Sequence, residues 1–97
     1  MRLNQDQAMA IHRLVKASLG SDSEVWLFGS RSDDAKRGGD VDLYVETRKP
    51  CELSKKLRLM TKIQLLVGLR KVDVIVKSDS SPDRAIYATA KSEGVQL

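Results

Sequence analysis

The feature that most constrains this chain is a stretch in which one apolar run stops at a Gly-Ser pair and a second begins around two aspartates. The first run, Val25-Trp26-Leu27-Phe28, ends at Gly29-Ser30. After a polar loop, the second run starts as Asp40-Val41-Asp42-Leu43. Successive side chains of a strand point to opposite faces, so Asp40 and Asp42 should share one face. The stretch predicts two strands joined by a loop, with two carboxylates at the start of the second.

These residue types point to phosphate and metal chemistry. Neighbouring carboxylates repel each other unless a cation lies between them. Mg²⁺ is the natural cation, since it is usually held by one or two carboxylates together with substrate phosphates. The Gly-Ser turn offers backbone N–H groups and a hydroxyl to such phosphates.

An Asp-x-Asp pair alone is weak support for a site, because Asp is common in turns and at strand ends. A third acid strengthens the pattern. Asp73 interrupts the apolar run 72–76, where an unpaired buried carboxylate would be costly. The ordered set of Gly-Ser, Asp-x-Asp and a later strand Asp therefore indicates a functional site.

Three segments carry a family resemblance: Gly29-Ser30-Arg31, Asp40-Val41-Asp42-Leu43 and Val72-Asp73-Val74. They resemble the nucleotidyltransferases of the DNA polymerase beta superfamily. The likeness is greatest to the minimal nucleotidyltransferases, which are antitoxins paired with HEPN-domain ribonuclease toxins, and it covers nearly the whole chain. The resemblance implies that nucleotide binding falls to Gly29, Ser30 and Arg31. It implies that catalysis and the binding of two Mg²⁺ ions fall to Asp40, Asp42 and Asp73.

The resemblance also implies a reaction and a partner. ATP would be the substrate, and AMP would pass to a tyrosine hydroxyl of a partner HEPN ribonuclease, which is thereby silenced. A chain of 97 residues is expected to form one domain, 1–97, with no room for an acceptor-binding domain. Two alternatives stay open: an inactive binding module of the same fold, and a homodimeric nucleotidyltransferase acting on a small molecule.

Composition and charge bear on where the protein is found and on the kinds of partner that it could bind. Hydrophobic residues make up 41% of the chain, and no apolar run approaches the ~20 residues of a membrane helix, so no membrane role is expected. Cys51 is the single cysteine, which suits a cytoplasmic protein. The net charge of +4 favours an anionic ligand or partner. With 4% aromatic residues a base-stacking surface is not expected, so neither is direct nucleic-acid binding.

Hydrophobic periodicity predicts an α/β (α+β) fold. A first helix should be capped by Asn4 and Gln7 and end at Gly20. The expected elements that follow are strand 24–28, strand 40–46, helix 53–69, strand 72–76 and a last helix that starts at Ser81-Pro82 and ends near Gly94. This order gives a three-stranded sheet flanked by helices, and the resemblance implies a mixed sheet like the palm of DNA polymerase beta.

The long helix over 53–69 shows two faces. The stripe expected to face the sheet consists of Leu57, Leu59, Met60, Ile63, Leu66 and Val67. The opposite face carries Lys55, Arg58 and Lys62 together with Leu65 and Leu69. Exposed leucines among basic residues predict a partner surface, for a second copy or for the partner ribonuclease.

Overall fold

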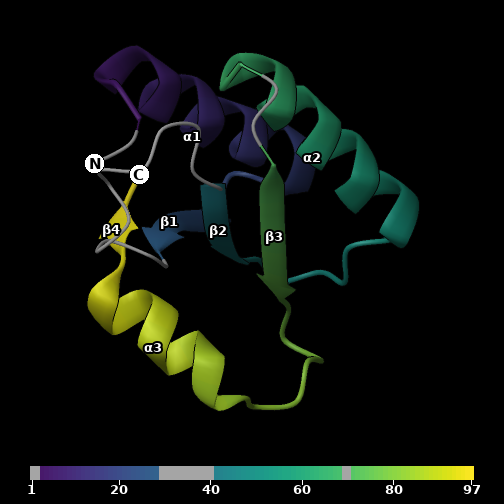
Figure 1. Cartoon of the computed structure of the whole chain (residues 1–97). Coiled ribbons are helices and arrows are strands. Elements are labelled where there is room, and N and C mark those ends of the chain that lie inside the picture. The colour runs from purple at the N-terminus through teal and green to yellow at the C-terminus, as the bar shows by residue number, and fades with distance from the viewer. Residues whose placement is uncertain (1–2, 29–40, 69–70) are drawn as a thin grey trace.

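The structure, a computed structural model, describes residues 3–28, 41–68 and 71–97, which form a sheet covered by helices on both faces (Figure 1). The elements in chain order are α1 (Gln5–Leu19), β1 (Glu24–Phe28), β2 (Val41–Glu46), α2 (Leu53–Leu66), β3 (Val72–Lys77), α3 (Ala85–Glu93) and β4 (Val95–Gln96). The strand order is β3-β2-β1-β4. β1 is antiparallel to β2 and β4, whereas β2 and β3 are parallel. The predicted mixed α/β fold is confirmed.

The sheet has a fourth strand that the sequence pattern did not predict. β4 pairs with β1, with Trp26 opposite Gln96 and Leu27 opposite Val95. A strand of two residues is too short to show the alternation by which strands are predicted. The prediction of three strands was wrong on this point.

The first helix begins and ends where its capping residues predict. The Asn4 side chain accepts a hydrogen bond from the Gln7 backbone N–H at 2.7 Å, and the Gln7 side chain accepts one from the Asn4 N–H at 3.1 Å. This reciprocal pair satisfies two N–H groups that have no partner within the helix. At the other end Gly20 has φ +111°, a conformation that glycine adopts without steric cost.

The second helix is shorter than predicted: it ends at Leu66, and Leu69 lies outside the described residues. Gly68 follows the helix with φ +82°, which is the usual left-handed way to end a helix. Leu59 and Ile63 of the helix are buried, and the buried Val67 directly after it continues their spacing of four residues.

Two leucines assigned to the sheet-facing stripe of α2 are exposed instead. Leu57 is 51% exposed and Leu66 is 39% exposed. At 100° per residue Leu57 lies on the far side of the helix from Leu59, and Leu66 lies at the edge of the buried stripe. The predicted stripe was therefore too wide, while Leu59, Ile63, Val67 and the partly buried Met60 were placed correctly.

The last helix starts at Ala85 with Arg84 as its N-cap, so the start predicted at Ser81-Pro82 was wrong. The Ser81 hydroxyl accepts a hydrogen bond from the Ser78 N–H at 3.0 Å. The Ser81 N–H in turn donates to the Ser78 carbonyl at 3.0 Å. Ser81 thus closes the preceding turn and is not available to cap a helix. The helix ends at Glu93 with Gly94 as its C-cap, close to the predicted end.

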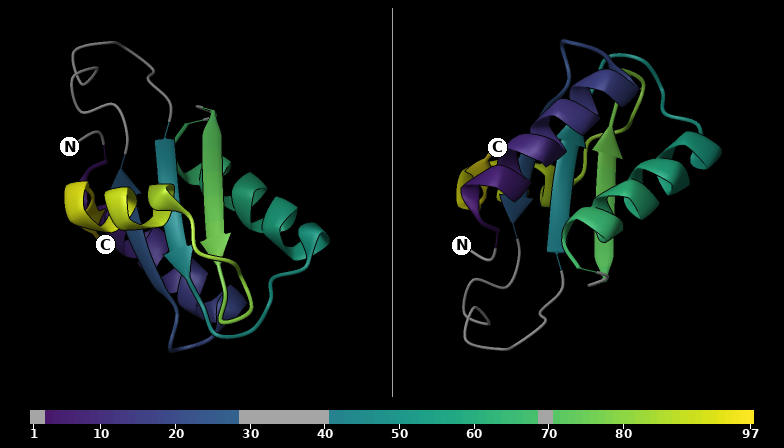
Figure 2. Two further views of the ribbon diagram at one scale, coloured as in Figure 1. Left: turned by 90° about the horizontal axis from the view of Figure 1, so that it is seen from below. Right: turned by 90° about the horizontal axis from the view of Figure 1, so that it is seen from above.

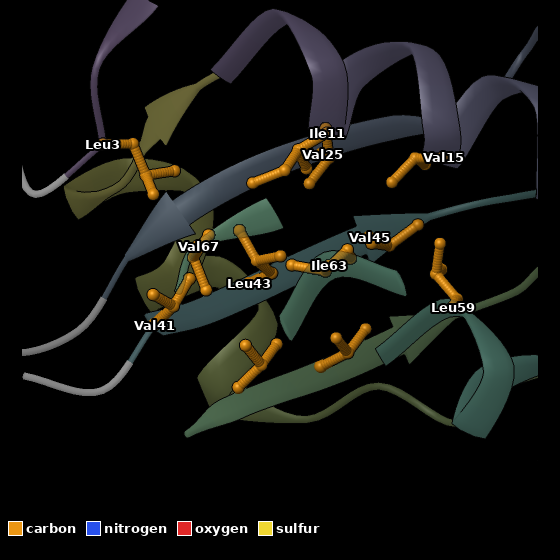
Figure 3. Close-up of a cluster of buried hydrophobic side chains, with 12 residues drawn as sticks. Leu3, Ile11, Val15, Val25, Val41, Leu43, Val45, Leu59, Ile63 and Val67 are labelled. Atoms are coloured by element: carbon orange, nitrogen blue, oxygen red, sulfur yellow. The ribbon is translucent and has the colours of Figure 1, made fainter. Parts of the chain in front are cut away.

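The two faces of the sheet carry different cores. The face under α1 and α2 is aliphatic, and Figure 3 shows side chains such as Ile11, Ile63 and Leu43 meeting between helices and sheet. The face under α3 holds Trp26, Tyr44, Tyr87 and Ala90. The alternation of strand side chains separates the two sets. Within the described residues, no helix has the length and apolarity needed to cross a membrane.

Candidate active site

Strand register brings two of the predicted acids together. Asp42 on β2 is paired with Asp73 on the parallel strand β3, and on its other side Asp42 is paired with Phe28, the last residue of β1. Paired residues on neighbouring strands point to the same face, and neighbouring strands lie about 4.8 Å apart. The two carboxylates therefore lie side by side at one end of the sheet.

The acids lie on the α3 face of the sheet. The residues flanking Asp42 and Asp73 in their strands are buried in the aliphatic core beneath α1 and α2, so both acids point the other way. α3 crosses over β1 and β2 on this face, as Figure 2 (left) shows. Asp42 is partly buried, whereas Asp73, on edge strand β3, is exposed. The pair is thus accessible to a ligand from the edge of the sheet.

The arrangement fits a divalent cation. Two adjacent carboxylates at a partly exposed sheet end provide hard oxygen ligands without burying unpaired charge. Among the described residues, no group of three or more His, Cys, Asp or Glu side chains comes together as a metal site. Asp42 and Asp73 make up the described part of the predicted set of three acids.

The other predicted site residues, Gly29, Ser30, Arg31 and Asp40, lie outside the described residues. β1 ends at Phe28 and β2 begins at Val41. Because Phe28 pairs with Asp42, the segment that joins these strands attaches to the sheet at the acidic end. The nucleotide-binding role of Gly29-Ser30-Arg31 and the metal-binding role of Asp40 remain predictions.

Tyr44, two residues after Asp42 on the same face, is the centre of an aromatic stack that the sequence analysis missed. Its ring lies 5.5 Å from that of Trp26 and 5.5 Å from that of Tyr87 on α3. Its hydroxyl donates a hydrogen bond to Glu46 at 2.7 Å. Burial and the Glu46 carboxylate raise the pKa of Tyr44, so the phenol stays a neutral donor. The alternation Asp42, Tyr44, Glu46 was the available signal.

A lysine of α3 adds two further contacts between this helix and the sheet. Lys91 forms an ion pair with Glu46 at 3.3 Å and lies 5.3 Å from the centre of the Trp26 ring. Together with the Tyr44–Tyr87 stack, Lys91 holds α3 against β1 and against β2, the strand that carries Asp42. A pocket of about 460 Å³ lies beside these residues, at the opposite end of the strands from the acids. Lys77 there is paired with Asp83 at 3.7 Å.

Comparisons with solved structures show the same fold. A crystal structure from Shewanella oneidensis matches with a TM-score of 0.72 and 17% identity, covering 98% of this chain and 71% of the other. A chain in the complex of tri-AMPylated Shewanella oneidensis HEPN toxin with MNT antitoxin matches with a TM-score of 0.72, 20% identity and coverage of 99% and 71%. A chain of a toxin–antitoxin crystal structure with AMP-PNP matches with a TM-score of 0.70, 20% identity and coverage of 97% and 72%.

Sequence comparison identifies the family. No curated protein sequence matches the chain. The family model described as Polymerase beta, Nucleotidyltransferase matches residues 22–97, which include every predicted site residue. The chain belongs to the polymerase beta nucleotidyltransferase family.

Proposed function

We propose that this protein transfers AMP from ATP to a tyrosine hydroxyl of a partner HEPN-domain ribonuclease. It thereby acts as the antitoxin of that ribonuclease. The observation that carries the proposal is the in-register pair of Asp42 and Asp73 on one accessible face, in a member of a nucleotidyltransferase family. Chains of the same fold occur in the structure of a tri-AMPylated HEPN toxin with MNT antitoxin and in a toxin–antitoxin structure with AMP-PNP.

In this proposal the acids hold the metal and the Gly-Ser turn holds the phosphates. Asp42 and Asp73, together with Asp40, would bind two Mg²⁺ ions, and Gly29, Ser30 and Arg31 would bind the phosphates of ATP. When bound, Mg²⁺ neutralises phosphate charge and lowers the pKa of the acceptor hydroxyl. The acids would thereby position the substrate and stabilise the developing charge at this end of the sheet.

The reaction needs no nucleophile from this chain. The acceptor oxygen forms a bond to the α-phosphorus of ATP, the bond from that phosphorus to the β-bridging oxygen breaks, and pyrophosphate leaves. The hydroxyl proton passes to solvent. His12, the one histidine, lies on α1, where its Nδ1 is 3.2 Å from the Leu97 carbonyl oxygen, and α1 covers the other face of the sheet. We place the reaction in the cytoplasm, where ATP is available.

Label transfer tests the proposed function. The purified protein is incubated with Mg²⁺, the HEPN ribonuclease proposed as its partner and ATP labelled at either the α- or the γ-phosphate. Label should pass to the ribonuclease from α-labelled ATP only. Label that enters a small molecule instead favours the homodimeric enzyme. Binding and silencing of the ribonuclease with no label transfer contradicts the proposal and favours the inactive binding module.

Ligand binding should raise the thermal stability of the protein. A ligand at a hundredfold excess over its Kd stabilises the folded state by about 2.7 kcal/mol. The melting temperature with ATP and Mg²⁺ should therefore exceed that with ATP and a chelator, measured by differential scanning fluorimetry. The double variant Asp42→Asn/Asp73→Asn is the matched control and should show no such difference. Equal melting temperatures for the wild-type protein at millimolar ATP and Mg²⁺ would contradict a metal-dependent nucleotide site.

A further inference from the structure

The outer side of the helical layer holds an apolar groove between α1 and α2. Its floor is formed by Ala10, Leu14 and Ala17 of α1 and by Leu65 and Leu66 of α2, and its volume is about 510 Å³. Figure 2 (right) shows the two helices lying side by side over the sheet. Near one end, the Gln7 side-chain amide donates a hydrogen bond to the Leu66 carbonyl at 3.2 Å.

Part of the apolar lining, above all Leu65, is not buried within the chain. Leu65 is 67% exposed, as the basic-face pattern predicted, and Leu66 beside it is 39% exposed. The two alanines on α1 are small, so a third helix can approach the layer closely. A groove between two helices with apolar positions at spacings of three and four residues suits an amphipathic helix.

The charged residues around the groove indicate which kind of helix could bind there. Arg13 and Lys62 are the charged residues of its lining, and both are basic. α2 carries four basic residues and no acidic one, and α1 carries Arg13 and Lys16 against Asp6. These two helices thus hold a net charge of +5, which exceeds the net charge of the whole chain, +4. A complementary helix would carry Asp or Glu along both sides of its apolar stripe.

We propose that this groove docks an amphipathic helix of the partner ribonuclease, with an apolar stripe flanked by carboxylates; this inference rests on the proposed function. A second copy of the chain fits less well, because an isologous contact would place two basic layers against each other. RNA also fits less well, because all four aromatic residues lie in β1, β2 and α3, on the opposite face of the sheet. In this proposal the partner docks on the opposite side of the sheet from Asp42 and Asp73.

This separation gives the proposal a distinct kinetic signature. Asp42 and Asp73 lie on the α3 face, whereas the groove lies on the outer side of the α1–α2 layer. A change in the groove should raise the KM for the ribonuclease and leave kcat unchanged. A change in the acids should lower kcat and leave binding of the ribonuclease intact.

The test uses Leu65→Glu, with Leu57→Glu as its matched control. Leu57 is also an exposed leucine of α2 but does not line the groove. Leu65→Glu should weaken binding of the purified partner ribonuclease by roughly thirtyfold or more, the effect of a hot-spot residue. Leu57→Glu should bind as the wild-type protein does. Arg13→Glu/Lys62→Glu should also weaken binding, and raising the salt concentration should weaken binding of the wild-type protein. Thermal melts of each variant alone verify folding.

Four results would overturn the proposal. If Leu65→Glu and the wild-type protein bind the ribonuclease with equal affinity, the groove is not its docking site. Continued label transfer would then leave the proposed function intact. A wild-type protein that is dimeric alone, and monomeric as Leu65→Glu, assigns the groove to a second copy. RNA binding that is lost in Arg13→Glu/Lys62→Glu assigns it to nucleic acid. A wild-type protein that neither binds nor labels the ribonuclease refutes both this inference and the proposed function.

Discussion

Replacing Asp73 by asparagine is expected to lower the rate of AMP transfer by about 10²–10³-fold, the loss seen when one charge-stabilising group is removed from an active site. The substitution keeps the size of the side chain and removes one negative charge beside Asp42. Because Asp73 is exposed on β3, the free energy of unfolding should change by no more than about 0.5 kcal/mol. Single-turnover transfer of label from α-labelled ATP to the ribonuclease measures the rate, and urea denaturation measures the stability.

Two other substitutions should be compared with Asp73→Asn in the same assay. Asp79→Asn removes the same charge from an exposed residue just beyond the opposite end of β3 and should transfer label at the wild-type rate. Asp42→Asn should lose nucleotide binding as well as transfer, since Asp42 is assigned to the metal that carries the nucleotide. Transfer by Asp73→Asn at the rate of Asp79→Asn would refute the assignment of Asp73 as a metal ligand.

Replacing Tyr44 by alanine should destabilise the protein by about 3–5 kcal/mol, the usual cost of removing a buried aromatic ring. Tyr44 is fully buried and stacks between Trp26 of β1 and Tyr87 of α3. The variant loses both ring contacts and leaves a cavity between the sheet and α3. Urea denaturation should show a lower midpoint with an unchanged dependence on urea concentration.

Tyr44→Phe separates the ring from its hydroxyl. It keeps the stack and removes only the hydrogen bond to Glu46, which remains paired with Lys91. The expected cost is about 0.5–1.5 kcal/mol. If Tyr44→Ala were no less stable than Tyr44→Phe, the aromatic stack would not be what holds α3 to the sheet.

The sequence indicated which residues the candidate site should contain, but not how the strands bring them together. The alternation around Asp42 and the acid within the β3 run could be recognised because local strand patterns show them. The pairing of Asp42 with Asp73 joins residues far apart in the chain, and the pattern of either strand alone does not set the register between them. Tyr44 was missed for the same reason, since its contact with Tyr87 depends on where α3 crosses the sheet.

The errors in the predicted fold arise where a sequence pattern is very short or is compatible with more than one structure. A serine before a proline is a good helix start, but Ser81 closes the turn with Ser78 instead. The two residues of β4 have no pattern of their own. Leu57 and Leu66 were assigned to the core as part of an apolar stripe along the helix, yet both are exposed.

The mass of the partner ribonuclease after co-expression tests the central claim most directly. Co-expressed with the wild-type protein, the ribonuclease should be heavier than its sequence mass by one or more AMP groups, carried on a hydroxyl-bearing residue. Co-expressed with Asp42→Asn/Asp73→Asn, it should have its unmodified mass. An unmodified ribonuclease that is nevertheless bound and silenced by the wild-type protein would contradict the account and leave a binding module in its place.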